Sequence, residues 1–422
     1  MISQKEYTKR RRKFAKKLPA GSIALFLSAL PKERSNDTEY PYRQNSNFYY
    51  LSGFKEDNAA LLFVKTDKAC KSYLFVQKKE PAMELWTGKR LGVEAAKELF
   101  DVDDVFSFEE LRKQLTAFGN GIQSFYYDFK EDEGRIAPLK QELKNLRSCH
   151  NAAEIVARAR LIKSAAEIKL IKKALAITKE AHHRAMQCSK ELSYEYELQA
   201  ELEYVFKKNG AYSDAYTSIV ACANAANTLH YISNDNRLLK KELILIDAGC
   251  EYEYYASDIT RTIPVSGKFT KAQKELYSLV LDVNKAIIEM IRPGILRSEL
   301  QEKSEELLCR GMVKLGILHG NVSELLEAKA HKKYYPHGIG HWMGLDVHDE
   351  CPYKDEKGKE IPLQAGMVLT IEPGIYIDQD DKSVPKKYRS IGIRIEDDIL
   401  VTKKGFENLS FDIVKEIKEI ES

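Results

Sequence analysis

Four acidic residues lie in short segments that are otherwise apolar and strand-like. Asp247 ends the run LILID, and Asp258 follows within SDITRTIPV. Glu372 lies in VLTIEPG and Glu396 in GIRIEDD. Asp and Glu are rare in strands, and a carboxylate taken out of water is unfavourable unless it is paired or bound to a metal. One arginine cannot neutralise four carboxylates, so the group predicts a site for divalent cations.

Three of the nine histidines lie in the segment HGIGHWMGLDVHD, at His337, His341 and His348. A helix would place the first two on one face, but the three glycines of this segment and its flanking prolines disfavour a helix. We therefore expect extended or looped backbone, in which His337 and His341 can still share a face. An imidazole added to four carboxylates gives a hard, oxygen-rich ligand set that suits Mn²⁺, with Zn²⁺, Co²⁺ and Fe²⁺ as alternatives.

A simpler interpretation exists for each residue taken singly. One buried carboxylate usually forms an ion pair with a lysine or arginine, and one histidine is usually satisfied by local hydrogen bonds. The metal site is the interpretation that accounts for the whole set together.

The acidic segments have the pattern of strands, and several helices precede and separate them. Ser164 and Glu167 form a capping box, after which apolar residues recur at helical spacing to about Gln187. Further helices are expected over residues 193–208, 270–291 and 297–315. The strands that end at Asp247 and begin near Asp258 are expected to pair, with the two aspartates facing each other. This part of the chain thus predicts helices packed with a mostly antiparallel sheet.

Two further details follow from the acidic strands. The Pro-Gly pair after Glu372 is expected to form a turn. Strict alternation in GIRIEDD places Ile393 and Ile395 on one face and Arg394 and Glu396 on the other.

The residues before about 130 predict an α/β layer structure. Strands are expected over 22–28, 59–65 and 72–77, and helices over 92–100 and 107–115. We place the domain boundary just before the capping box, which gives an N-terminal α/β domain at 1–160 and a second domain at 161–422. The basic run YTKRRRKFAKKL is interpreted as the solvated face of an amphipathic helix, because Tyr7, Phe14 and Leu18 fall near helical spacing.

Charge and composition exclude several classes of protein. The 66 basic and 63 acidic residues give 66 − 63 = +3, which argues against nucleic acid or an anionic membrane as a partner. Apolar runs are too short for a transmembrane helix. The seven cysteines are odd in number and scattered, which favours reduced thiols and a cytoplasmic location.

Several segments together resemble the pita-bread metallopeptidases, in particular the Xaa-Pro aminopeptidase family. They are LIDAGCEYEYYASDITRTIPV, HGIGHWMGLDVHD, LTIEPGIY and GIRIEDD, with YPYRQNSNFYYLSGF at 40–54 and ELWTGKRLG at 84–92 in the first block. The resemblance covers most of the chain. It implies an α+β fold with a C-terminal pita-bread domain and a creatinase-like N-terminal domain. It also implies removal of the first residue from peptides with proline in second position.

The resemblance also implies roles for individual residues. Two divalent cations, with Mn²⁺ expected first, would be bound by five ligands: Asp247, Asp258, His341, Glu372 and Glu396. Glu372 would also accept the proton of the attacking water. His348 would donate a hydrogen bond to the reacting carbonyl, and His230 would project into the site beside it.

The remaining implied residues contact the substrate. His337 would line the pocket for the proline, with Arg394 and Tyr376 nearby. In related aminopeptidases the aromatic residue at the position of Trp86 helps to close a neighbouring subunit's pocket, which implies a homodimer or homotetramer. The alternative is that Trp86 is a core or surface aromatic of its own domain.

Three other functions share part of this pattern. An Xaa-Pro dipeptidase shares the ligands and remains an alternative. A non-catalytic pita-bread binding protein is disfavoured because all five ligand positions are filled, and creatinase shares the fold but not the ligand set. One segment departs from the family pattern: VACANAAN at 220–227 replaces a glycine-richer stretch, which leaves the shape of that loop open.

Overall fold

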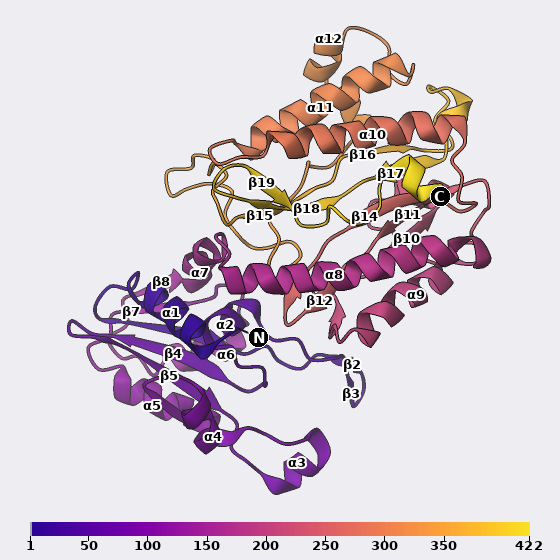
Figure 1. Cartoon of the computed structure of the whole chain (residues 1–422). Coiled ribbons are helices and arrows are strands. Elements are labelled where there is room, and N and C mark those ends of the chain that lie inside the picture. The colour runs from indigo at the N-terminus through magenta and orange to yellow at the C-terminus, as the bar shows by residue number, and fades with distance from the viewer. Residues whose placement is uncertain (1) are drawn as a thin grey trace. The chain divides into compact units, whose positions relative to one another are not determined.

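The computed structural model describes residues 2–422, which form two compact units (Figure 1). The first unit ends at Arg160, and the second spans Leu161–Ser422.

A six-stranded mixed sheet forms the centre of the first unit, in the order β6-β5-β4-β1-β7-β8. The strands are β1 (Ser22–Leu27), β4 (Ala60–Lys65), β5 (Cys70–Val76), β6 (Asp104–Ser107), β7 (Ser124–Tyr127) and β8 (Ser148–Asn151). The two central connections are antiparallel, β1 with β4 and β4 with β5, and the outer pairs are parallel. A small hairpin, β2 (Glu33–Ser35) with β3 (Thr38–Glu39), stands outside this sheet.

This unit also contains α-helices. They are α1 (Gln4–Ala15), α2 (Ser46–Ser52), α3 (Pro81–Thr87), α4 (Gly92–Leu99), α5 (Leu111–Phe118), α6 (Glu133–Lys140) and α7 (Ala152–Arg160). Apolar residues of α5 and α6, such as Leu115 and Ile136, pack into one cluster with the central strands. The strands and helices expected from the sequence are present, except that the segment expected as one helix over 107–115 is a 3₁₀ turn (Phe108–Glu110) followed by α5.

The basic run at the start of the chain is only partly solvated. Tyr7 and Phe14 are buried on α1 as expected, but so are Arg10 and Arg11. Their guanidinium groups donate hydrogen bonds to the carbonyl oxygens of Tyr50 and Leu51, at 3.2 and 2.9 Å. Those carbonyls belong to the last turn of α2 and have no partner within that helix. The interpretation of the whole run as a solvated face is therefore wrong for these two arginines, which complete the end of α2.

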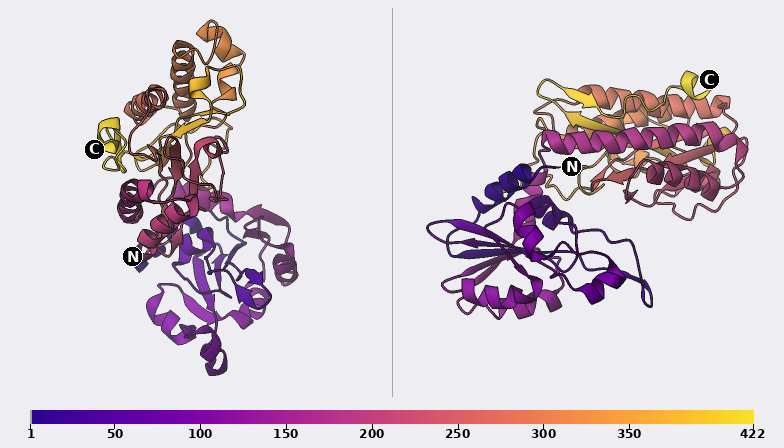
Figure 2. Two further views of the ribbon diagram at one scale, coloured as in Figure 1. Left: turned by 90° about the vertical axis from the view of Figure 1, so that its right-hand side faces the viewer. Right: turned by 60° about the horizontal axis from the view of Figure 1, so that its bottom comes forward.

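The second unit contains four long helices and two short ones. They are α8 (Ala165–Cys188), α9 (Glu195–Lys208), α10 (Lys271–Met290), α11 (Arg297–Lys314), α12 (Val322–Glu327) and α13 (Ile417–Ile420). The predicted capping box of α8 is confirmed, because the Ser164 amide donates to Glu167 at 2.8 Å and the Glu167 amide donates back to Ser164 at 3.4 Å. Figure 2 shows α8 running along much of the length of this unit.

Short antiparallel strands fill the space between these helices. They are β9 (Ser213–Asp214), β10 (Ile219–Cys222), β11 (Leu243–Asp247), β12 (Cys250–Tyr252), β13 (Tyr255–Ala256), β14 (Thr260–Pro264), β15 (Val368–Ile371), β16 (Gly374–Ile377), β17 (Ile391–Arg394), β18 (Asp397–Val401) and β19 (Phe406–Asn408). In Figure 1 strands β10, β11 and β14–β19 lie between helix α8 and the pair α10–α11. One apolar cluster joins α10 and α11 to β15–β18, and a second joins α8 and α9 to β10, β11 and β14.

The predicted pairing of the two strands is confirmed, but the register does not place the two aspartates opposite each other. Strand β11 pairs with β14 in antiparallel register, and Asp247 lies opposite Thr260. The intervening residues form β12 and β13, which pair with each other as a hairpin. Asp258 lies two residues before Thr260, at the entry to β14.

The Pro-Gly pair after Glu372 does not form the expected turn. Strand β15 pairs with β18, and β16 continues onward to pair with β17. Pro373 instead lies in the gap between the pair β15–β18 and the pair β16–β17. The chain continues through this gap in the same direction. Proline lacks a backbone N–H, so it cannot donate to a continuous ladder at this point.

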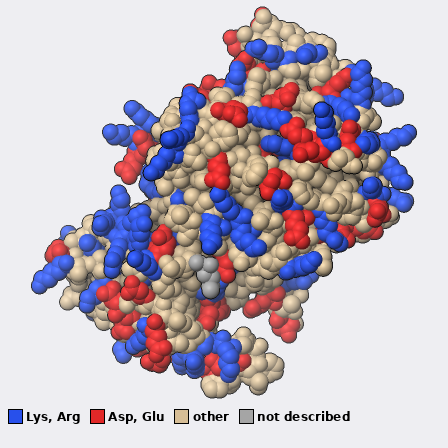
Figure 3. Space-filling model, viewed as in Figure 1, with Lys and Arg blue, Asp and Glu red and all other residues tan. Residues whose placement is uncertain are grey.

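The surface carries both signs of charge. On the face drawn in Figure 3, basic and acidic side chains are interspersed across the second unit. Within residues 2–422, no helix combines the length and apolar character needed to cross a bilayer.

Candidate active site

One pocket of about 510 Å³ in the second unit brings together most of the residues singled out in the sequence. The predicted residues that line it are His230, Asp247, Asp258, His337, His341, His348, Glu372, Arg394 and Glu396. They come from strand ends and loops, because β11, β14, β15 and β18 all begin or end here. Residues far apart in sequence, such as His230 and Glu396, meet in this pocket because the short strands converge on it.

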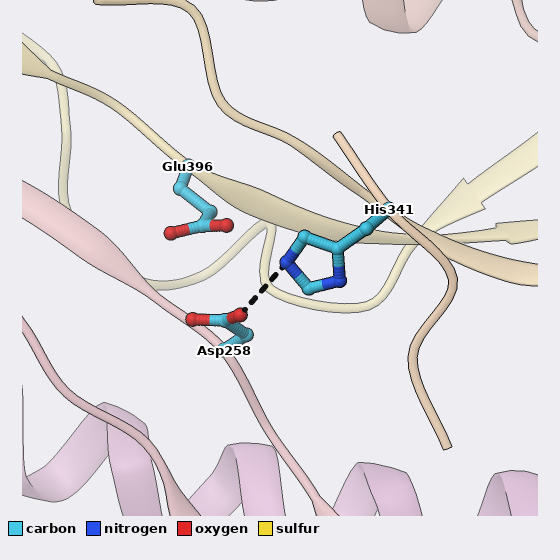
Figure 4. A group of neighbouring side chains, drawn as sticks. All are labelled: Asp258, His341 and Glu396. Atoms are coloured by element: carbon cyan, nitrogen blue, oxygen red, sulfur yellow. Dashed lines mark ion pairs between the residues drawn. The ribbon is translucent and has the colours of Figure 1, made fainter. Parts of the chain in front are cut away.

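Three of the predicted metal ligands form a compact group. Ligand atoms of Asp258, His341 and Glu396 all lie within 4.8 Å of one another, and His341 Nε2 is 3.3 Å from Asp258 Oδ2. Figure 4 shows the two carboxylates and the imidazole ring directed toward one another. Asp258 and Glu396 are buried, and each lies just outside the end of a strand. Two carboxylates and one imidazole at this spacing are a donor set that fits a divalent cation.

The other two predicted ligands border the same space. Asp247 accepts hydrogen bonds from the Arg394 guanidinium and the Tyr216 hydroxyl, both at 2.6 Å. Glu372 Oε1 lies 3.7 Å from His341 Nε2, and its Oε2 lies 3.8 Å from His337 Nδ1. All five predicted ligands therefore face one pocket, although the compact group contains only three of them.

The carboxylates raise one another's pKa. Burial and neighbouring acids raise the pKa of Glu372 to about 7, that of Glu396 well above its ordinary value, and that of Asp247 above its ordinary value. Burial disfavours the charged form of His341, but Asp258 and Glu372 outweigh it and raise the pKa of His341 to about 9. A bound divalent cation would stabilise the ionised form of these buried acids, which otherwise resist ionisation.

The ring of His341 is oriented by the backbone of the next residue. Its Nδ1 lies 3.1 Å from the Trp342 carbonyl oxygen, which leaves Nε2 directed at the carboxylates. The backbone of this segment also exchanges hydrogen bonds with β15, since the Thr370 amide donates to the His341 carbonyl at 2.9 Å. At Gly340 a side chain is excluded, because a Cβ there would lie 1.9 Å from the Thr370 carbonyl oxygen.

A chain of hydrogen bonds crosses one wall of the pocket. The Tyr376 hydroxyl lies 2.8 Å from His337 Nε2 and accepts a hydrogen bond from Arg394 at 2.9 Å. Arg394 in turn binds Asp247. Burial and the Arg394 charge lower the pKa of His337 to about 3, so this imidazole is neutral at physiological pH.

The other two predicted histidines also border the pocket. His348 packs edge-on against His341, with ring centroids 4.1 Å apart. Partial burial and His341 lower the pKa of His348, which keeps it neutral near pH 7. His230 lines the pocket from the segment after the 3₁₀ turn Ala223–Asn227. The segment VACANAAN forms the end of β10, at residues 220–222, and then that turn; Ala223 has a φ of 55°, a conformation that is uncommon for residues other than glycine.

Trp86 belongs to the first unit rather than to this pocket. It lies on the short helix α3 and is 83% exposed. The alternative of a core aromatic is therefore excluded, and Trp86 is a surface residue of its own unit.

Sequence reasoning missed several residues that support the site. Tyr216 lines the pocket and binds Asp247, while Thr260 Oγ1 donates to Glu396 at 2.7 Å and accepts from Arg394 at 3.0 Å. Thr370 Oγ1 accepts from the His341 amide at 3.1 Å. For the two threonines the signal was their position two residues from a predicted ligand, since alternate strand residues share a face. Tyr216 carried no comparable signal.

Comparison with protein families and with known proteins gives a consistent result. The model of metallopeptidase family M24 matches residues 169–403, and that of the aminopeptidase P N-terminal domain matches residues 7–126. The chain is 41% identical to the Xaa-Pro aminopeptidase of Escherichia coli (strain K12), with 100% of this chain and 98% of the relative covered. It is 36% identical to Xaa-Pro aminopeptidase 3 of Homo sapiens, with 100% and 86% covered.

Solved structures agree with these relatives. Aminopeptidase P from E. coli with the inhibitor Pro-Leu has a TM-score of 0.95 to this chain at 40% identity, with 100% of this chain and 98% of that chain covered. The zinc-substituted E. coli enzyme in complex with product has a TM-score of 0.96 at the same identity and coverage. The α+β class and the pita-bread fold expected from the sequence are confirmed by this likeness.

Proposed function

The chain belongs to metallopeptidase family M24, and on that premise we propose that it is a metal-dependent Xaa-Pro aminopeptidase. It releases the first residue of peptides whose second residue is proline. The observation that carries the proposal is the group of ligand atoms of Asp258, His341 and Glu396 within 4.8 Å, in a chain that matches Xaa-Pro aminopeptidases over its whole length.

We propose that the pocket holds two divalent cations, with Mn²⁺ as the first candidate. Their ligands are Asp247, Asp258, His341, Glu372 and Glu396. Four carboxylates and one imidazole are a hard donor set, which supports Mn²⁺ over a metal that prefers thiolates. A cation held there would supply Lewis acidity, which lowers the pKa of water and polarises a peptide carbonyl.

The chain's own residues then move protons and bind charge. Glu372 accepts the proton of the attacking water, which is supported by a pKa raised to about 7 by burial and neighbouring acids. His348 donates a hydrogen bond to the carbonyl oxygen as charge develops on it, and the lowered pKa of His348 supports a neutral imidazole in this role. His230 assists from the same pocket.

Selectivity comes from two ends of the substrate. Asp247 binds the free amino terminus, which restricts cleavage to the first peptide bond. His337 and Arg394 line the part of the pocket that receives the proline, and the Tyr376 hydroxyl supports both of them by hydrogen bonds. The bond before proline is a tertiary amide without an N–H, so a site that demands no hydrogen bond from that nitrogen accepts it.

Three further parts of the proposal concern organisation. Residues 161–422 form the catalytic domain, and residues 1–160 form an N-terminal domain that acts on substrate choice and assembly. The enzyme is a homodimer or homotetramer in which Trp86 helps to close a neighbouring subunit's pocket. It acts in the cytoplasm.

The test uses peptides that differ in one feature at a time. An Xaa-Pro-Xaa tripeptide, the Xaa-Pro dipeptide and an Xaa-Ala-Xaa tripeptide are incubated with protein that was stripped by a chelator and then reloaded with Mn²⁺. We expect cleavage of the proline tripeptide only, and none before reloading. Cleavage restricted to the dipeptide would identify a dipeptidase, and equal cleavage of the alanine peptide would contradict selectivity for proline.

A further inference from the structure

A buried ion pair lies beside the active-site loop but outside the pocket. Lys163 Nζ lies 3.0 Å from Asp349 Oδ2, and both side chains are only 1% exposed. Neither residue lines the pocket. Asp349 directly follows His348 in sequence, and Lys163 directly precedes Ser164, the N-cap of α8.

Both ends of this pair are fixed. The Lys163 amide donates to the Gly366 carbonyl at 2.8 Å, just before β15. The Asp349 amide donates to the Trp342 carbonyl at 2.8 Å, which closes the loop 342–349 at its base. Asp349 thus stands at the foot of the loop, directly after His348.

The loop also packs tightly on the pair. A Cβ at Gly344 would lie 2.6 Å from Asp349 Oδ2 and 2.9 Å from Lys163 Cε, so this position has no room for a side chain. The Gly344 carbonyl accepts a hydrogen bond from the Ala256 amide at 2.9 Å, close to Asp258. Contacts on two sides therefore set the path of the loop.

The ring of His348 lacks comparable support of its own. Across residues 2–422, its one aromatic contact is the edge-on packing against His341, and no hydrogen bond holds the ring. The position of the imidazole therefore depends on the backbone that carries it, and that backbone is anchored at Asp349.

Stability alone does not account for such a pair. Desolvation of two charges offsets most of their attraction, and an apolar pair of similar volume is often as stable. Removing only one partner leaves an uncompensated buried charge and is strongly destabilising. A buried ion pair next to a catalytic residue is better explained by the backbone geometry that the pair imposes.

We propose that Lys163 and Asp349 are positioning residues that hold His348 in place for its action on the reacting carbonyl. This inference rests on the proposed function, because it assumes that His348 acts there. The pair does not touch the substrate, and its effect passes through the backbone of the loop.

The central variant replaces both charges by apolar side chains, Lys163→Met with Asp349→Leu. Because no lone charge remains buried, this double variant is expected to unfold at a temperature close to that of the wild type, whereas each single variant unfolds earlier. Its metal content and KM are expected to stay near wild-type values. Its kcat for an Xaa-Pro-Xaa peptide is expected to fall on the order of 10- to 100-fold, as for a misplaced catalytic group.

A cycle with His348→Ala separates positioning from general damage. If the pair acts through His348, the Met/Leu replacement will lower kcat in the wild-type background but not in the His348→Ala background. An equal loss in both backgrounds, loss of metal in the double variant, or an unchanged kcat would each overturn the inference.

A measurement that does not depend on catalytic activity distinguishes this inference from the proposed function. In protein with isotope-labelled histidine that is loaded with diamagnetic Zn²⁺ in place of Mn²⁺, the His348 ring resonance is assigned by its absence in His348→Ala. The double variant is expected to broaden or shift that resonance while the other histidine signals stay in place. An inactive wild type would defeat the proposed function alone, whereas an unperturbed His348 resonance in the double variant would defeat the positioning role.

Discussion

Glu372 and Glu396 lie opposite each other at the gap between two strand pairs. Ile371 pairs with Asp397 on one side of the gap and Gly374 with Arg394 on the other, so the register places the two glutamates face to face. Their amides do not pair with each other. The Glu372 amide donates to the Ile339 carbonyl at 2.8 Å, and the Glu396 amide donates to the Thr260 carbonyl at 3.1 Å. Because the ladder is interrupted here, these two amides instead bind the segments that carry His341 and Asp258.

The clustered histidines are expected to differ in what they lose on substitution. His341→Ala removes the imidazole that lies 3.3 Å from Asp258, so both bound metal and rate should fall. His348→Ala should keep the metal and lower kcat on the order of 10²- to 10³-fold, as for removal of one oxyanion donor. Metal analysis alongside kinetics checks this. Equal metal loss in both variants would contradict the assigned roles.

Metal binding is expected to tighten as pH rises. In the metal-free protein, Glu372 with a pKa of about 7 and His341 with a pKa of about 9 both hold protons near pH 6. A cation must displace these protons, so its affinity grows as they are lost. Because both pKa values are raised by folding, the stability that these two groups give the metal-free protein is present at low pH. It is lost as pH rises through about 7 for Glu372 and about 9 for His341.

The measurement is the rise in Tm caused by Mn²⁺, compared at pH 5.5 and pH 8. The rise should be larger at pH 8, and a Glu372→Gln/His341→Ala variant should show little rise at either pH. Metal-loaded and metal-free protein are compared at the same pH, so the effect on Tm of groups that titrate elsewhere cancels. One such group is His182, whose pKa is lowered to about 3 by burial. A rise that is equal at both pH values, or larger at pH 5.5, would contradict the expectation.

Gln301 on α11 is expected to support the first part of the histidine segment. Its side-chain oxygen accepts the Ile339 amide at 2.6 Å, and its nitrogen donates to Glu305 at 2.7 Å. Gln301→Leu leaves that amide unpaired, at a cost of about 1–3 kcal/mol. The free energy of unfolding should fall accordingly, and metal affinity should weaken because His341 lies two residues on. Glu302→Leu, at an exposed neighbouring position, is the control and should change neither quantity.

Trp86→Ala is expected to leave the fold and the metal content intact. An exposed side chain contributes little to stability, within about 0.5 kcal/mol. On the proposed role, the variant should handle short peptides worse than long ones, because short substrates have the fewest other contacts. Leu85→Ala, at a position 82% exposed on the same helix, is the matched control. Kinetics against peptide length and mass by light scattering decide the matter, and a monomer of full activity would contradict the role.

The sequence was most informative where a residue type conflicted with the secondary-structure pattern around it. Acidic residues in apolar strands pointed to the pocket, and the alternation of residues 393–396 correctly placed Arg394 and Glu396 together on the pocket side. Helix starts with reciprocal caps, such as Ser164, were also predictable because both partners lie within one turn.

Long-range partners were not predictable in the same way. The Pro-Gly pair after Glu372 has the composition of a turn, and only the pairing of β15 with β18 and of β16 with β17 shows that the chain runs on. Arg10 and Arg11 looked solvated because their acceptors, in α2, lie 40 residues away. Tyr216 was missed for the same reason, since its link to Asp247 arises only on folding.

Gly340 shows how a residue without a functional group can become as intolerant of change as a ligand. Its backbone passes so near the Thr370 carbonyl that even alanine would require β15 or the His341 segment to move. In a saturation mutagenesis scored by activity, every substitution at this position would be depleted alongside those at the neighbouring histidine. Depletion at Gly340 would reflect the lack of space between two backbone segments. Fitness data alone therefore could not distinguish this position from a catalytic one.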